Sequence, residues 1–126
     1  MKKKTVYYAH FMGIYNTKQE ERDMELLKTL FPDADIINPN CAEIQEKCNQ
    51  IKETGGNVMD MFEDIVKGCS VVAFRGCVNG KIGAGVWKEI MAAKECGIPV
   101  VELPSYLDRE MSVEDTRLML TELGCR

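Results

Sequence analysis

Short apolar runs alternate with amphipathic segments along the chain, and this pattern predicts alternating strands and helices. The apolar runs predicted to be strands are residues 5–9 (TVYYA), 34–39 (ADIINP), 70–74 (SVVAF) and 98–103 (IPVVEL). Residues 70–74 are apolar at almost every position, which is typical of a strand covered on both faces of its sheet.

The segments between these runs carry apolar residues at helical spacing. Thr17-Lys18-Gln19-Glu20 has the form of a capping box and predicts the start of the first helix. Further helices are predicted over residues 41–53, 57–67, 85–96 and 112–124. The acidic run Glu20-Glu21-Arg22-Asp23 is interpreted as the solvated start of the first helix.

Strands that alternate with helices indicate an α/β fold with a parallel sheet and right-handed crossovers. We therefore predict a small doubly wound, flavodoxin-like or Rossmann-like sheet with helices on both faces, formed by a single domain over residues 1–126. Ligands of such sheets bind beyond the carboxyl ends of the strands. This rule nominates His10, Asn38 and Asn40, together with the segments 75–89 and 102–105.

Composition removes several classes of function. The chain of 126 residues has a formal net charge of −4, which argues against a general nucleic-acid binder. No apolar run approaches about 18 residues, so no membrane span is expected. The N-terminus has no apolar stretch of signal-peptide length, and we expect a cytoplasmic protein.

The cysteines give no sign of a metal centre. The six cysteines form no CxxC pair, and a single histidine is present to join them. Most of them are interpreted as small buried apolar residues, with no disulfide framework. We expect neither a metal nor an organic cofactor.

The glycine-rich stretch 79–89 (NGKIGAGVWKE) is the strongest candidate for chemistry. Gly80, Gly83 and Gly85 allow backbone amides to approach a ligand, and the helix start behind them favours an anion or a sugar oxygen. The stretch lacks the GK[ST] ending of a phosphate-binding P-loop. Because Glu89 is the only acidic residue between Asp64 and Glu95, it is the candidate catalytic carboxylate.

This arrangement resembles the nucleoside 2-deoxyribosyltransferases and the related deoxynucleoside 5′-monophosphate N-glycosidases. It is also similar to the lysine-decarboxylase-like phosphoribohydrolases, whose motif has the form GGxGTxxE. The matching residues are Gly83, Gly85, Val86 and Glu89, and the runs VYYAH, IINPN and PVVEL resemble the family's strands. The resemblance implies cleavage or transfer at the N-glycosidic bond of a nucleoside or nucleotide, with a 2′-deoxy sugar and Glu89 as the nucleophile.

The resemblance also implies a second acid on the helix before the third strand. By spacing, that position falls on Phe62, and we select Asp60 over Glu63 and Asp64. A base is expected to stack on Tyr8 or Tyr15, and Arg75 beside Gly76 is expected to bind a phosphate.

Other interpretations stay open. Met91 stands where the family usually has glycine, which favours a nucleotide-binding sensor without catalysis, and a ribonucleotide phosphoribohydrolase is a further alternative. In the alternative interpretation without a functional role, Glu89 is a solvated helix residue and His10 is a hydrogen-bonded residue at a strand end. Asn38 and Asn40 are then turn formers. The family implies a homodimer or larger homo-oligomer, with Trp87 and the methionines as candidate interface residues.

Overall fold

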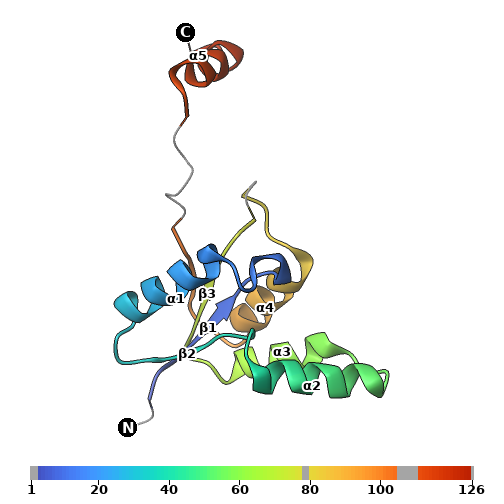
Figure 1. The fold of residues 1–126 in the computed structure, drawn as a ribbon. Helices are drawn as coiled ribbons and strands as arrows, with labels where there is room; N and C mark the ends of the chain where they lie inside the picture. The colour runs from blue at the N-terminus through green and yellow to red at the C-terminus, as the bar shows by residue number, and fades with distance from the viewer. Residues whose placement is uncertain (1–2, 78–79, 105–110, 126) are drawn as a thin grey trace.

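The computed structural model describes residues 3–77, 80–104 and 111–125, and it contains a parallel four-stranded sheet (Figure 1). The strands are β1 (Thr5–Ala9), β2 (Asp35–Ile37), β3 (Val71–Phe74) and β4 (Val100–Glu102), in the order β2-β1-β3-β4. Every neighbouring pair is parallel. The predicted α/β class and the doubly wound parallel sheet are confirmed.

The helices follow the predicted segments closely. They are α1 (Lys18–Leu30), α2 (Ala42–Glu53), α3 (Val58–Lys67), α4 (Ala84–Glu95) and α5 (Val113–Glu122), with a short 3₁₀ turn η1 (Met12–Ile14) after β1. Side chains of Thr17, Asn57 and Ser112 cap α1, α3 and α5, because each accepts a hydrogen bond from a first-turn amide.

The start of α1 differs in one respect from the predicted capping box. The Thr17 side chain accepts from the Glu20 amide, as expected. However, the amide of Thr17 itself donates to the Ile14 carbonyl of η1, and Glu20 Oε1 accepts from the preceding amide of Asn16. Asn16 has a φ of 63°, the left-handed conformation that asparagine tolerates, and this allows the chain to turn between η1 and α1.

Side chains of the strands alternate between the two faces of the sheet, and each face has its own apolar cluster. Tyr7, Val72 and Phe74 pack with residues of α3 and α4. Val6, Tyr8, Ala73 and Leu103 pack on the opposite face with Leu27 of α1. Figure 1 shows α1 on one side of the sheet and α3 and α4 on the other. The prediction that residues 70–74 are covered on both faces is therefore confirmed.

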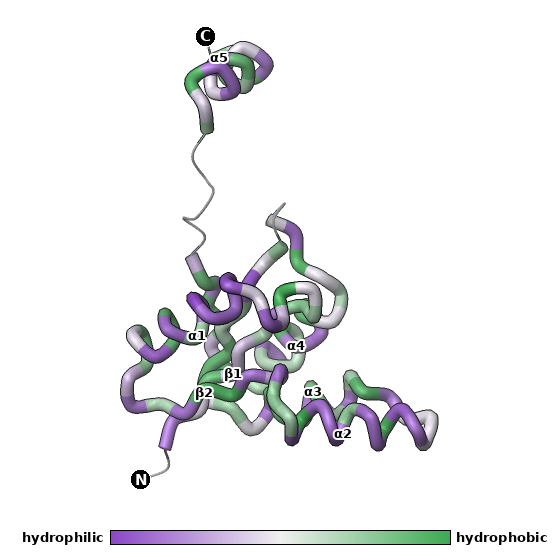
Figure 2. Tube along the Cα trace, in the orientation of Figure 1, coloured by the Kyte–Doolittle hydropathy of each residue, from purple (hydrophilic) through white to green (hydrophobic). Residues whose placement is uncertain are grey.

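Helices α2 and α5 are the more peripheral elements. Helix α2 packs on α3, and Figure 2 shows hydrophilic and hydrophobic positions alternating along it. Helix α5 contains no buried residue, and its Val113, Leu118 and Leu123 are exposed. Within the described ranges, no helix combines the length and apolar character needed to cross a membrane.

The cysteines are less buried than the sequence suggested. Cys48 and Cys69 are buried, but Cys41, Cys96 and Cys125 are exposed and Cys77 is half-buried; all six are free thiols. The prediction that most are core residues is wrong, because the exposed cysteines lie at or just beyond helix ends, where little of the chain covers them.

Candidate active site

A cavity of about 390 Å³ lies against the carboxyl end of β1 and the N-terminal end of α4. Its wall is formed by the segment after β1, by α2 and α3, and by the glycine loop that leads into α4. Most of the lining is apolar or aromatic, with Phe62, Tyr15 and Met59 among its side chains. Such a lining suits a flat, largely apolar ligand group.

Glu89 lines this cavity from the second turn of α4 and is only 7% exposed. Its Oε2 atom has no hydrogen-bond partner, and the same holds for the hydroxyl of Tyr7, a fully buried residue of β1 that lines the same cavity. Buried polar atoms are normally paired. Two unpaired polar groups at one cavity are therefore available to a ligand.

The surroundings of Glu89 perturb its protonation. Burial raises the pKa of Glu89 to about 7, and the nearby Tyr7 hydroxyl opposes this rise. Burial and the neighbouring Glu89 carboxylate raise the pKa of Tyr7, so the phenol stays neutral and is able to donate a hydrogen bond. A carboxyl poised near neutrality in a cavity is typical of catalytic sites.

The pKa of Glu89 predicts a pH-dependent effect on stability. Because the folded-state pKa lies above the ordinary value of 4.5, the fold favours the protonated carboxyl, and the stability this provides is lost as the pH rises through about 7. The Glu89→Gln variant stays neutral, so at pH 8 its free energy of unfolding is expected to exceed that of the wild type by about 2 kcal/mol. Urea unfolding at pH 5 and pH 8 checks this. An equal difference at both pH values would contradict it.

The glycine loop opens the start of α4 toward the cavity. Gly83 is the N-cap, has no side-chain cap bond, and lines the cavity with Ala84 and Gly85. A Cβ at Gly83 would meet no atom within 4 Å, and of the three glycines only Gly80 has a positive φ, of 80°. Packing therefore does not require glycine at 83. The first turn of α4 has no side-chain cap and begins at the cavity wall, which suits a ligand oxygen as the acceptor for its amides.

The structure brings five of the individually nominated residues together at the cavity: His10, Tyr15, Gly83, Gly85 and Glu89. Asn38, Asn40, Tyr8, Arg75, Gly76 and Asp60 are not part of its described lining. Val78 and Asn79 of the nominated segment 75–89 and Ser105 of the segment 102–105 lie outside the described residues.

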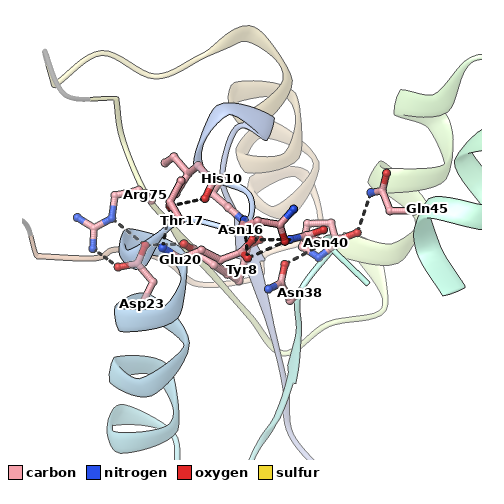
Figure 3. A network of polar contacts seen from close by, with 12 residues as sticks. Tyr8, His10, Asn16, Thr17, Glu20, Asp23, Asn38, Asn40, Gln45 and Arg75 are labelled. Carbon is pink, nitrogen blue, oxygen red and sulfur yellow. Dashed lines mark hydrogen bonds and ion pairs between the residues drawn. The ribbon is translucent and has the colours of Figure 1, made fainter. Parts of the chain in front are cut away.

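Arg75 is engaged elsewhere. Arg75 is 5% exposed, and its guanidinium pairs through two nitrogens with Asp23 (Figure 3). The guanidinium also donates to the carbonyl oxygens of Leu103 and Pro104. To bind a phosphate, Arg75 would have to leave this pair. Gly76 follows it, and a Cβ there would lie 3.6 Å from the Lys81 carbonyl oxygen.

Tyr8 and Tyr15 have different environments. Tyr8 is fully buried, donates its hydroxyl proton to Asp23 and stacks on His10 with ring centroids 3.7 Å apart. Tyr15 lines the cavity, and burial raises its pKa to about 12. Of the two tyrosines nominated for stacking, only Tyr15 is accessible to a ligand in the cavity.

The predicted second acid lies away from the cavity. Asp60 is exposed on α3, whereas its neighbours Met59 and Phe62 line the cavity. Glu63 and Asp64 are also absent from the described lining, in which Glu89 is the only acidic residue. Helical periodicity explains this for Asp60 and Asp64, because these exposed residues lie on the side of α3 opposite its apolar face. The described residues also contain no group of three acidic, histidine or cysteine side chains arranged to hold a metal.

Asn38 and Asn40 form contacts within the protein. The Asn38 side chain accepts from the amide of Asn40, and the Asn40 side chain donates to Asn16 and Glu20. Pro39, between them, does line the cavity.

Sequence reasoning missed several residues. Gln45, Cys48 and Lys52 of α2 line the cavity at helical spacing, a signal that was present in the sequence but had no recognisable chemistry.

The interpretation of the acidic run as a solvated helix start is wrong for two of its members. Glu20 is 8% exposed and Asp23 is 1% exposed, since both face ionic partners from other segments.

Comparisons of the chain with protein-family models and with curated protein sequences find no match. The geometry of the cavity and the buried Glu89 carboxylate are therefore the basis of the functional proposal.

Proposed function

We propose that this protein cleaves or transfers at the N-glycosidic bond of a nucleoside or nucleotide, most simply one with a 2′-deoxy sugar, and that Glu89 is the nucleophile. The observation that carries the proposal is the buried Glu89 carboxylate with an unpaired oxygen in an apolar cavity beside the open start of α4. The resemblance of Gly83, Gly85, Val86 and Glu89 to the deoxyribosyltransferase motif agrees with it.

In the proposed reaction, a carboxylate oxygen of Glu89 forms a bond to the anomeric carbon of the sugar. The bond to the base breaks, and the base leaves with the electron pair and takes up a proton. Water or a second base then attacks the anomeric carbon and releases Glu89, as in retaining glycosidases. The aromatic lining, including Tyr15 and Phe62, supports a planar base.

The neutral Tyr7 phenol is suited to assist this carboxylate. It lowers the pKa of Glu89, so it favours the ionised form that attacks. The Tyr7 hydroxyl forms no hydrogen bond with any described residue.

The direct test is incubation of the protein with matched panels of deoxyribo- and ribonucleosides and their 5′-monophosphates, followed by chromatography for free base. Release of base from a deoxynucleoside supports the proposal. Release from ribonucleotides alone favours the phosphoribohydrolase alternative. Binding without release from any compound favours the sensor, and addition of a second base distinguishes transfer from hydrolysis.

The pH–rate profile gives a further prediction. Since Glu89 must be ionised to attack, kcat/KM is expected to fall about tenfold per pH unit well below its pKa of about 7. In Tyr7→Phe the midpoint is expected to move to higher pH, with kcat/KM at pH 7 lowered about fivefold. A profile unchanged by Tyr7→Phe would contradict the assisting role of the phenol.

A non-catalytic nucleotide sensor is the second candidate. It is favoured by the cavity lining, where Glu89 is the only acid that the structure describes, and by Met91 in place of the family glycine. Both candidates share the ligand class and differ in whether base is released.

We also propose that the protein acts as a homodimer or larger assembly in the cytoplasm. Trp87 and Met91 of α4 are 46% and 39% exposed and lie one turn apart, which suits a surface covered by a partner. The six free thiols agree with a reducing compartment.

A further inference from the structure

The Glu20 carboxylate of α1 contacts three other segments of the chain: the end of β1, the turn before α1 and the residues after β2. Its Oε2 lies 2.8 Å from His10 Nε2, at the end of β1. Its Oε1 accepts from the amide of Asn16 at 3.1 Å, before α1, and from the Asn40 side chain at 2.9 Å, after β2 (Figure 3). One carboxylate in α1 therefore holds the ends of β1, β2 and the intervening turn together.

His10 faces a hydrogen-bond acceptor at each ring nitrogen. Nδ1 lies 3.1 Å from the carbonyl oxygen of Tyr8, and Nε2 faces the Glu20 carboxylate. A neutral imidazole donates from only one nitrogen, so both contacts are satisfied when the ring is an imidazolium. The Glu20 carboxyl supplies the matching negative charge: burial alone would raise its pKa, but bonds from His10, Asn16 and Asn40 lower it overall.

The rings around His10 also favour a cation. Tyr8 stacks on one side at 3.7 Å, and Tyr15 lies at 4.9 Å with a tilt of 48°. Aromatic faces attract a buried cation. Tyr8, Tyr15 and Glu20 are thus the titratable groups that face the ring in the described structure, with Asp23 behind Tyr8 and held to Arg75.

Although His10 lines the cavity, its nitrogens are both engaged, so it has no proton to exchange with a ligand. His10 instead helps to fix the position of the cavity wall that follows it in the chain. Phe11, Met12, Gly13 and Tyr15 line the cavity, and the flanking His10 and Asn16 are both bound to Glu20. Phe11 and Met12 are 38% and 67% exposed and Ile14 is the buried side chain of this turn, so the contacts of the flanking residues with Glu20 add to the packing of Ile14.

We propose that Glu20 and His10 form a charged clamp, an imidazolium–carboxylate pair that holds residues 11–15 as one wall of the ligand cavity. Both are positioning residues that act on ligand binding, and Glu89 carries the chemistry. The effect on substrate rests on the proposed function, whereas the clamp itself does not.

The chain contains a single histidine, which makes the clamp directly observable. In ¹⁵N-labelled wild type at pH 7, both ring nitrogens of His10 are expected to show imidazolium chemical shifts. Glu20→Gln keeps the shape but removes the charge, and its His10 is expected to be neutral at the same pH. A neutral ring in the wild type, or an imidazolium that persists in Glu20→Gln, would overturn the proposal.

Glu20→Ala tests the wall. Hydrogen exchange at the Tyr15 and Asn16 amides is expected to accelerate at least about tenfold, because the contact with His10 and the charge-assisted hydrogen bonds from Asn16 and Asn40 to the carboxylate are lost. KM for a substrate found in the nucleoside panel is expected to rise about tenfold, with kcat changed less than about threefold. Glu21→Ala, at an exposed position of the same helix, is the control and leaves all readouts unchanged.

The outcomes separate the two proposals. If no compound is processed, the proposed function fails, and the histidine shifts and amide exchange still decide the clamp. If exchange is unchanged in Glu20→Ala, or kcat falls while KM stays constant, the clamp is overturned and the proposed function survives. Should Glu20→Ala fail to fold, amide exchange in Glu20→Asp, whose shorter side chain cannot span all three contacts, replaces it with the same criteria.

Discussion

Glu89→Gln is expected to eliminate base release, lowering kcat by about 10⁴-fold or more, while ligand binding stays within about threefold of wild type. The amide keeps the size of the carboxylate and its place at the cavity, but it cannot form the ester with the anomeric carbon. Single-turnover assays with chromatography measure the loss, and calorimetric titration with the same nucleoside measures the binding.

The control for this substitution is Glu95→Gln, an exposed glutamate of the same helix that lies outside the cavity lining. It is expected to retain full activity. Residual base release by Glu89→Gln at more than about one hundredth of the wild-type rate would mean that the nucleophile is another group or water. The gain in stability of Glu89→Gln at pH 8 then serves as evidence that the variant is correctly folded.

Breaking the Asp23–Arg75 pair is expected to have the largest effect on stability. Asp23 is 1% exposed and Arg75 is 5% exposed, and they connect α1 with the end of β3 across one face of the sheet. Asp23→Leu or Arg75→Met alone removes one charge of this buried pair, and each is expected to cost about 3–5 kcal/mol of unfolding free energy.

The double variant Asp23→Leu/Arg75→Met is the informative comparison. Because it removes both charges, it is expected to be more stable than either single variant, although the Tyr8 hydroxyl and two carbonyl oxygens lose their partners. Urea unfolding of the wild type, the two single variants and the double variant gives the coupling free energy between the two charges. Losses that simply add would show that the two charges do not interact across this face. Glu25→Leu/Lys28→Met, at exposed positions of α1, is the surface control.

Local patterns in the sequence were sufficient for the fold. Apolar runs of strand length, the Thr17 cap and the consecutive apolar positions of 70–74 are local signals, and they led to the correct class and sheet type. The same topology placed His10 and Glu89 at the carboxyl end of the sheet, where both line the cavity. Parallel strands bring such residues together regardless of their distance along the chain.

The polar residues of the site were harder to predict, because their partners are distant. Glu20 and Asp23 look like ordinary residues of an acidic helix start, yet they pair with His10 and with Arg75, 52 positions away. Alternation along β1 shows that Tyr7 and Tyr8 face opposite sides but not which side holds the cavity. Asp60 is exposed because of its position around the axis of α3. The family's second acid corresponds by spacing to Phe62, which lines the cavity but is not acidic, so the spacing did not identify an acid.

The strand order has a consequence for biosynthesis. β1 leaves the ribosome first but lies in the middle of the sheet, between β2 and β3, and its partner β3 starts only at Val71. Until that later segment emerges, the nascent chain cannot enclose Tyr7, and α4 with its glutamate follows later still. A ribosome stalled before β3 would therefore carry an open, chaperone-accessible intermediate, and the cavity around Glu89 would form as one of the last events of folding.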